Sequence, residues 1–113
     1  MVARYVPEAG DIAWLDFDPQ AGSEQGRRRP ALVLTDQTYN LASGLAVVCP
    51  LTSKRKPYPF ALPVFVDKVE GAVLVDHVKS VDWKARKAVF HSKANPALLS
   101  KVRTYIAVLL RVR

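Results

Sequence analysis

Short runs of apolar or alternating residues recur along the chain between turn signals. They cover Asp11 to Asp18 after Gly10, Ala31 to Thr35 after Pro30, Leu45 to Leu51 after Gly44, Phe60 to Val66 after Pro59 and Ala72 to Val75 after Gly71. Short strands bounded by glycine and proline are typical of a small β barrel or sandwich. In the first run, Ala13 and Leu15 fall on one face of the strand and Ile12 on the other, so we expect both faces to be partly covered.

The pattern changes to a helical period near the end of the chain. Asn95 is suited to cap a helix and Pro96 to its first position. Apolar residues then recur at helical spacing up to Arg113, at Leu98, Val102, Ile106 and Leu109. We therefore predict a C-terminal helix, whose cationic end at Arg111 and Arg113 suits the helix dipole and needs no functional explanation.

Two intermediate segments are less regular. Residues Asp36 to Ser43 are polar and predict a loop or a short helix between strands, and His77 to Phe90 predicts one or two further strands. We expect Lys84, Arg86 and Lys87 to face mostly outward, and His77 to pack against the barrel.

Length and charge narrow the class of protein. The chain has 113 residues, half of them apolar, which is enough for one compact domain over residues 1–113. The chain has 17 lysines and arginines and 10 aspartates and glutamates, so its net charge is +7 and a polyanionic partner is favoured. No apolar run approaches the length of a membrane span or a secretory signal, so we expect a soluble cytoplasmic protein with no membrane partner.

Neither the cysteine nor the histidines indicate a metal or cofactor. Cys49 is the single cysteine and lies in an apolar run, where a buried, unreactive thiol is expected. His77 and His91 have no further histidine or cysteine at ligand spacing. We therefore expect no metal site and no cofactor.

Two segments carry candidate chemistry. The loop Gly22 to Pro30 brackets Glu24 and three arginines with glycines, and arginine forks match phosphate oxygens. Thr52 and Ser53 follow an apolar strand, so a guanidinium and a hydroxyl would meet at one phosphate if Arg29 and Thr52 lie on neighbouring strands.

Simpler interpretations stay open for the same residues. The arginine loop is also compatible with a solvated surface turn, with Glu24 as a local ion partner. Thr52 and Ser53 are compatible with an ordinary strand end. Trp14 and Trp83 are more typical of a core or an interface than of base stacking.

Longer motifs nevertheless resemble the MazF/PemK toxins of toxin-antitoxin pairs. The resemblance rests on the segments Arg4 to Pro7, Gly10 to Ile12, Trp14 to Pro19, Gly22 to Gly26 with Arg29-Pro30, Val48 to Thr52, Tyr58 to Phe60, Asp76 to Val81 and Trp83 to Arg86. It therefore spans nearly the whole chain. Two departures from the family pattern are His77, where relatives often carry glutamine, and the pair Arg27-Arg28 before Arg29.

The resemblance implies a mainly β fold with a C-terminal helix, a small SH3-like β barrel that works as a homodimer. It implies a ribosome-independent endoribonuclease that cuts single-stranded RNA at a short sequence without a metal, and a MazE-like antitoxin as partner. The products would be a 2′,3′-cyclic phosphate and a 5′-hydroxyl. The family's functional residues fall on Arg29, Thr52 and Glu24, and RNA contacts are expected at Phe17, Ser23, Gln25, Arg27, Arg28, Ser53, Lys54, Lys56, Tyr58 and Lys79.

The chemistry of RNA cyclisation suggests how these residues would act. Arg29 suits stabilisation of the phosphorane and proton donation to the leaving 5′-oxygen, but it is a poor base because arginine stays protonated near neutral pH. Thr52 would hydrogen-bond a non-bridging oxygen, and Glu24 is a candidate base or a holder of Arg29. The alternatives are a toxin similar to CcdB that poisons DNA gyrase, disfavoured because the chain ends without an aromatic residue, and a plain RNA-binding barrel.

Overall fold

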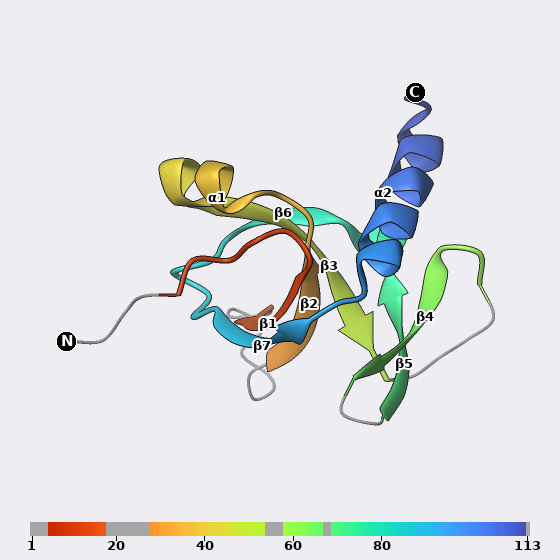
Figure 1. The fold of residues 1–113 in the computed structure, drawn as a ribbon, viewed down its shortest axis with the longest axis horizontal. Coiled ribbons are helices and arrows are strands. Elements are labelled where there is room, and N and C mark those ends of the chain that lie inside the picture. The colour runs from red at the N-terminus through yellow and green to blue at the C-terminus, as the bar shows by residue number, and fades with distance from the viewer. Residues whose placement is uncertain (1–4, 18–27, 54–57, 67–68, 113) are drawn as a thin grey trace.

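The fold is a curved antiparallel sheet with two α-helices (Figure 1). A computed structural model describes residues 5–17, 28–53, 58–66 and 69–112. The strands are β1 (Asp11–Asp16), β2 (Arg28–Val33), β3 (Leu45–Thr52), β4 (Ala61–Val66), β5 (Val69–Leu74), β6 (Lys79–Asp82) and β7 (Val89–Lys93). The helices are α1 (Gln37–Ser43), a short 3₁₀ helix (Val75–His77) and α2 (Pro96–Leu110).

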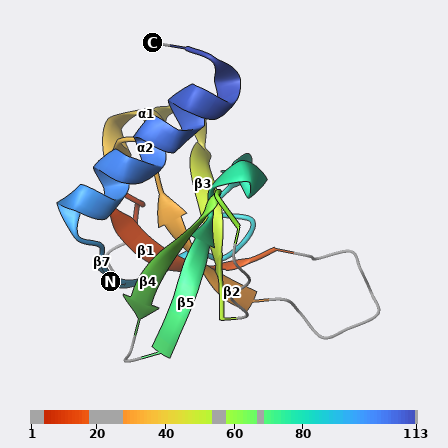
Figure 2. The same cartoon turned by 90° about the vertical axis from the view of Figure 1, so that its right-hand side faces the viewer.

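Strand β3 organises the sheet. Within the described residues the strand order is β4-β5-β3-β2-β1-β7, and β6 pairs with the first half of β3. The second half of β3 lies between β2 on one side and β5 on the other. Figure 2 shows β4 and β5 side by side below α2. The predicted mainly β fold with a C-terminal helix is confirmed.

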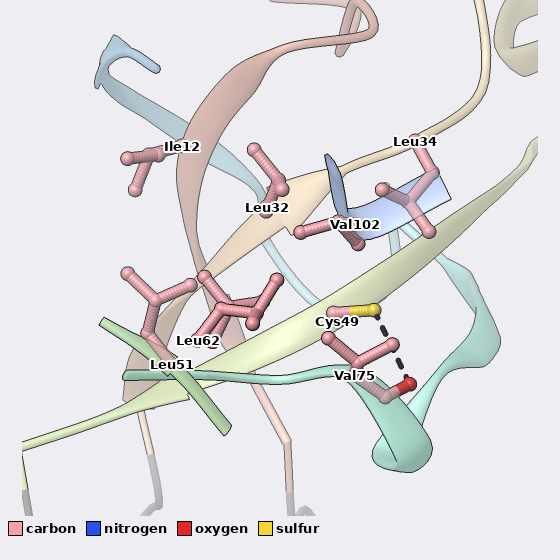
Figure 3. Packing of buried hydrophobic residues seen from close by; sticks show 9 residues of the cluster. Ile12, Leu32, Leu34, Cys49, Leu51, Leu62, Val75 and Val102 are labelled. Atoms are coloured by element: carbon pink, nitrogen blue, oxygen red, sulfur yellow. Dashed lines mark hydrogen bonds between the residues drawn. The ribbon is translucent and has the colours of Figure 1, made fainter. Parts of the chain in front are cut away.

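The sheet is covered on both faces, as the alternation in its strands predicts. One cluster gathers Ile12 of β1 with Leu32, Cys49, Val73 and other buried residues. Residues on the opposite face, including Ala13 and Leu15, form a second cluster around Val48 and Trp83. Figure 3 shows the first cluster, in which Val102 from α2 lies among the strand residues.

Helix α2 begins where the sequence predicts. The Asn95 side chain accepts a hydrogen bond from the Ala97 amide at 2.8 Å, and Pro96 occupies the first turn. Val102 is completely buried in the first cluster, and Leu98, Leu99 and Ile106 pack against the same cluster. The regular helix ends at Leu110 rather than Arg113, because Arg111 adopts a left-handed conformation with φ of 61°.

Helix α1 is tied to the sheet by a buried amide. Asn40 is fully buried, and its Nδ2 donates to the carbonyls of Pro7 and Thr35 at 2.8 and 2.9 Å. The Trp83 indole donates to the Asn40 carbonyl at 2.9 Å. The short helix that the sequence allowed for this segment is therefore present, and Trp83 is a core residue.

Three sequence predictions need correction. β2 begins at Arg28 and β5 at Val69, each three residues earlier than the apolar runs suggested, because backbone pairing extends beyond the apolar segments. His77 does not pack against the barrel: it ends the 3₁₀ helix and is exposed.

Candidate active site

The ends of β2 and β3 bring Arg29 and Thr52 together. In the antiparallel register Ala31 faces Pro50 and Leu32 faces Cys49. The pairing stops at Ala31 and Pro50, and Arg29 and Thr52 each lie two residues beyond it, on the same side of the pairing. The neighbouring strands required for a shared phosphate site are therefore present.

Both residues line one pocket of about 440 Å³. Arg29 contributes a guanidinium, Thr52 and Ser53 contribute hydroxyls, and Glu70 contributes a carboxylate. The remaining wall is formed by Trp14, Pro30, Leu51, Val64, Val66 and Gly71. A cation and hydroxyls beside an apolar surface can hold a phosphate next to a base or sugar.

Arg28 has different surroundings from Arg29. Its Nη1 forms an ion pair with Asp16 at 2.8 Å, and its Nη2 donates to the Lys87 carbonyl at 2.7 Å. Asp16 is also its cross-strand neighbour on β1. Of these two arginines, Arg29 is the one that lines the pocket, whereas an RNA contact by Arg28 stays a prediction.

Phe17 and Lys79, both predicted to contact RNA, contact each other. The Lys79 ammonium lies 5.4 Å from the centre of the Phe17 ring, within the range of a cation–π interaction. Phe17 follows β1 and packs on the second core cluster, whereas Lys79 begins β6 and is exposed. The pair forms a small cationic and aromatic surface.

The hydroxyl of Tyr58 is held by a hydrogen bond, whereas the residue as a whole is half exposed. The hydroxyl hydrogen-bonds the Asp76 carboxylate, and this bond raises the pKa of Tyr58. Its ring lies edge-on to Phe60, with centroids 6.4 Å apart. Since 47% of Tyr58 is exposed, the ring offers a stacking surface whose position is fixed at one end.

Arg86 was wrongly expected to face solvent. Its Nη1 donates to the carbonyls of Asp16 and Phe17 at 3.0 and 3.2 Å, and the Asp16 amide donates to the Arg86 carbonyl at 3.0 Å. The turn of residues 83–87 therefore holds the end of β1 through the bonds of Arg86, and the start of β2 through the bond from Arg28 to the Lys87 carbonyl. Sequence reasoning missed this role, since an arginine in a polar turn looks like an ordinary surface charge.

Other pocket residues also carried no clear sequence signal. Trp14 was interpreted as core or interface, but it is partly buried, lines the pocket and lies edge-on to His91 with centroids 5.6 Å apart. Glu70 and Gly71 fall just before a predicted strand and belong to no motif. Six predicted site residues lie outside the described residues: Ser23, Glu24, Gln25, Arg27, Lys54 and Lys56.

Cys49 has the surroundings of a structural residue. It is fully buried, and its thiol points to the Val75 carbonyl at 3.7 Å (Figure 3). Burial, assisted by the nearby Asp76 carboxylate, raises its pKa to about 12. The thiol is therefore unsuited to nucleophilic catalysis.

Metal-binding clusters and membrane-spanning helices are both absent from the described residues. Across the part of the chain that the structure describes, no three or more His, Cys, Asp and Glu side chains gather as a metal-binding group would. In the same residues, no helix is both long and apolar enough to cross a bilayer.

Comparison with known proteins decides the family. A family model described as the PemK-like, MazF-like toxin of type II toxin-antitoxin systems matches residues 8–110. The chain belongs to this family. The resemblance identified from the sequence motifs is thereby confirmed.

Individual relatives cover nearly the whole chain. The endoribonuclease toxin MazF of Escherichia coli K12 is 42% identical over 110 residues, 97% of this chain and 99% of that protein. The endoribonuclease toxin ChpB of the same strain is 39% identical over 94 residues, 78% of this chain and 80% of that protein.

Solved structures show the same fold. MazF from Deinococcus radiodurans (Form-I) superposes with a TM-score of 0.86 at 46% identity, covering 96% of this chain and all of that one. A MazE-MazF structure (Form-II) from the same organism gives the same TM-score and identity, covering 97% of this chain and all of the matched chain.

Proposed function

We propose that this protein is the toxin of a toxin-antitoxin pair and acts as an endoribonuclease on single-stranded RNA. The observation that carries the proposal is the convergence of Arg29 and Thr52 on one pocket in a member of this family. Relatives with 42% and 39% identity are endoribonuclease toxins, which supports the assignment. The net charge of +7 favours a polyanionic substrate.

The reaction is a transesterification within the RNA strand. The 2′-oxygen attacks the adjacent phosphorus as its proton leaves, and the bond from phosphorus to the 5′-oxygen breaks as that oxygen gains a proton. The products are a 2′,3′-cyclic phosphate and a 5′-hydroxyl. No oxidant, reductant or metal is needed for the atoms and charges to balance.

Arg29 and Thr52 share the stabilisation of this transition state. The Arg29 guanidinium offsets the charge that accumulates on the phosphorane and donates toward the leaving 5′-oxygen. The Thr52 hydroxyl donates to a non-bridging oxygen. Their positions on adjacent strands keep both groups on one pocket without a change in the backbone.

Two carboxylates are candidates to accept the 2′-hydroxyl proton. Glu24 is the candidate from the sequence motif, and Glu70 is the carboxylate that lines the pocket among the described residues. Cleavage rates of Glu24→Gln and Glu70→Gln against pH separate them. Removal of the base eliminates the rise in rate with pH, whereas removal of a positioning carboxylate lowers the rate and preserves the rise.

The test of the activity itself uses metal-free conditions. The purified chain is incubated with a long unstructured RNA in EDTA beside an Arg29→Ala control, and the fragment ends are determined. Discrete cuts with cyclic phosphate ends, absent in the control, are expected. Intact RNA with salt-sensitive binding would indicate an RNA-binding barrel, and intact RNA with inhibition of gyrase would indicate the CcdB-like alternative.

Two partners complete the proposal. A MazE-like antitoxin is supported by the MazE-MazF structure of a relative with 46% identity, and its co-expression is expected to abolish cleavage. A homodimer is supported by the exposed apolar side chains near the end of α2, at Val108, Leu109, Leu110 and Val112. Light scattering of the purified chain is expected to give twice the mass of the monomer.

A further inference from the structure

Gly71 lies against the backbone of Thr52. β5 pairs with the end of β3 so that Val73 faces Leu51 and Ala72 faces Thr52. The next residue, Gly71, is buried and lines the same pocket as Arg29 and Thr52.

The approach leaves no room for a side chain. A Cβ atom on Gly71 would lie 2.5 Å from the Thr52 carbonyl oxygen, 3.4 Å from the Thr52 carbonyl carbon and 3.6 Å from the Ser53 Cα. All three atoms belong to the backbone, so rotation of a side chain cannot relieve the contact. The positive-φ glycines in the described residues are Gly10 and Gly44, so close approach rather than backbone conformation requires glycine at position 71.

A methyl group on residue 71 would displace Thr52, which carries the hydroxyl. Ordinary contact requires about 3.5 Å, so the Thr52 carbonyl and the Gly71 Cα would have to separate by about 1 Å. β5 is held from its other side, where Val64 on β4 pairs with Gly71 in a six-residue ladder. The end of β3 is therefore expected to move at least in part, and Thr52 with it.

We propose that Gly71 is a positioning residue for the cleavage reaction: its lack of a side chain sets the position of the Thr52 hydroxyl relative to the Arg29 guanidinium. The inference rests on the proposed ribonuclease function. A displacement of 1 Å at a reacting group can lower a rate by about 100-fold. Gly71→Ala should therefore slow the chemical step while RNA still binds.

The experiment measures single-turnover cleavage in EDTA at saturating RNA, RNA affinity and thermal unfolding. Gly71→Ala is expected to cleave about 10- to 100-fold more slowly, to bind RNA with nearly unchanged affinity and to unfold cooperatively. Gly44→Ala is the matched control. Gly44 has φ of 77°, which strains any other residue, and an added Cβ would have no atom within 4 Å, so the substitution should lower stability without affecting the pocket. Its cleavage rate should stay at the wild-type level.

A double-mutant cycle shows whether Gly71 acts through Thr52. In a Thr52→Ala background, Gly71→Ala should cost little further rate, because the hydroxyl that it displaces is already gone. An equal cost in both backgrounds, a wild-type rate for Gly71→Ala, or failure of Gly71→Ala to fold would each overturn the proposal. Failure of the wild-type chain to cleave would instead refute the ribonuclease function.

Discussion

At the scale of single residues, adjacent arginines have different surroundings. Arg28 is paired with Asp16 and the Lys87 carbonyl, whereas Arg29 lines the pocket with Thr52. The sequence marks both as phosphate candidates, and Pro30 favours the second. The sequence alone cannot identify the partners of Arg28, since these lie 12 and 59 positions away along the chain.

The Tyr58 side chain allows stacking to be separated from hydrogen bonding. Tyr58→Phe keeps the ring but loses the bond to Asp76, so RNA affinity should change little. Tyr58→Ala removes the ring and should weaken RNA binding by about 1–3 kcal/mol if one base stacks on it. Fluorescence anisotropy with a labelled single strand provides the measurement. Equal losses in both variants would contradict a stacking role.

At the scale of elements, the turn of residues 83–87 controls where β1 ends and β2 begins. Arg86 satisfies the carbonyls of Asp16 and Phe17, and Lys87 accepts from Arg28. The segment that contains Glu24 joins these same strand ends in sequence. The turn is therefore expected to matter for both stability and cleavage.

Replacement of Arg86 tests this role. Arg86→Ala should lower the free energy of unfolding by about 1–3 kcal/mol, because two carbonyls lose a charged donor. Cleavage should fall as well. Lys84→Ala, in the same turn with an exposed side chain, serves as the control and should change neither. Denaturant unfolding and cleavage assays give the two readouts, and identical behaviour of the two variants would contradict the role.

The spacing of apolar residues predicted most helices and strands, but not the residues at which β2 and β5 begin. Helix α2 followed from Asn95, Pro96 and the apolar spacing, and each apolar run overlaps a strand. The early starts of β2 and β5 could not be predicted, because hydrogen bonds to neighbouring strands determine them rather than local composition. The position of Gly71 in the pocket could not be predicted for the same reason.

At the scale of the whole molecule, the first core cluster links stability to pH through Cys49. Its pKa is raised to about 12 by burial and by Asp76, so the folded protein retains a proton that an unfolded thiol releases above about pH 9. The unfolded state then binds fewer protons, and stability falls as pH rises from about 9 to 12. The expected slope is about 1.4 kcal/mol per pH unit from this group.

Cys49→Ala isolates this contribution. The variant should be less stable at neutral pH because it leaves a small cavity, but its stability should decline less steeply above pH 9. Urea denaturation at several pH values measures both curves. Parallel curves for the two proteins would show that Cys49 does not retain its proton on folding.

The pocket itself is a property of the whole sheet. Its walls come from β1, β2, the end of β3, β4 and β5, so it depends on strand order and register. The sequence motifs named Arg29 and Thr52, and the register accounts for their meeting. Trp14 and Glu70 join them only through tertiary pairing, which a single sequence does not display.

The most direct test of the central claim compares Arg29→Ala with Arg28→Ala in EDTA, with single-turnover cleavage and RNA affinity measured for each. Arg29→Ala should lose several powers of ten in cleavage with a much smaller loss in affinity, because the proposed role of Arg29 is to stabilise the transition state. Arg28→Ala should retain most of its cleavage and lose stability modestly. Equal losses of cleavage and affinity in Arg29→Ala, or a larger loss of cleavage in Arg28→Ala, would contradict the assignment of Arg29 as the catalytic arginine.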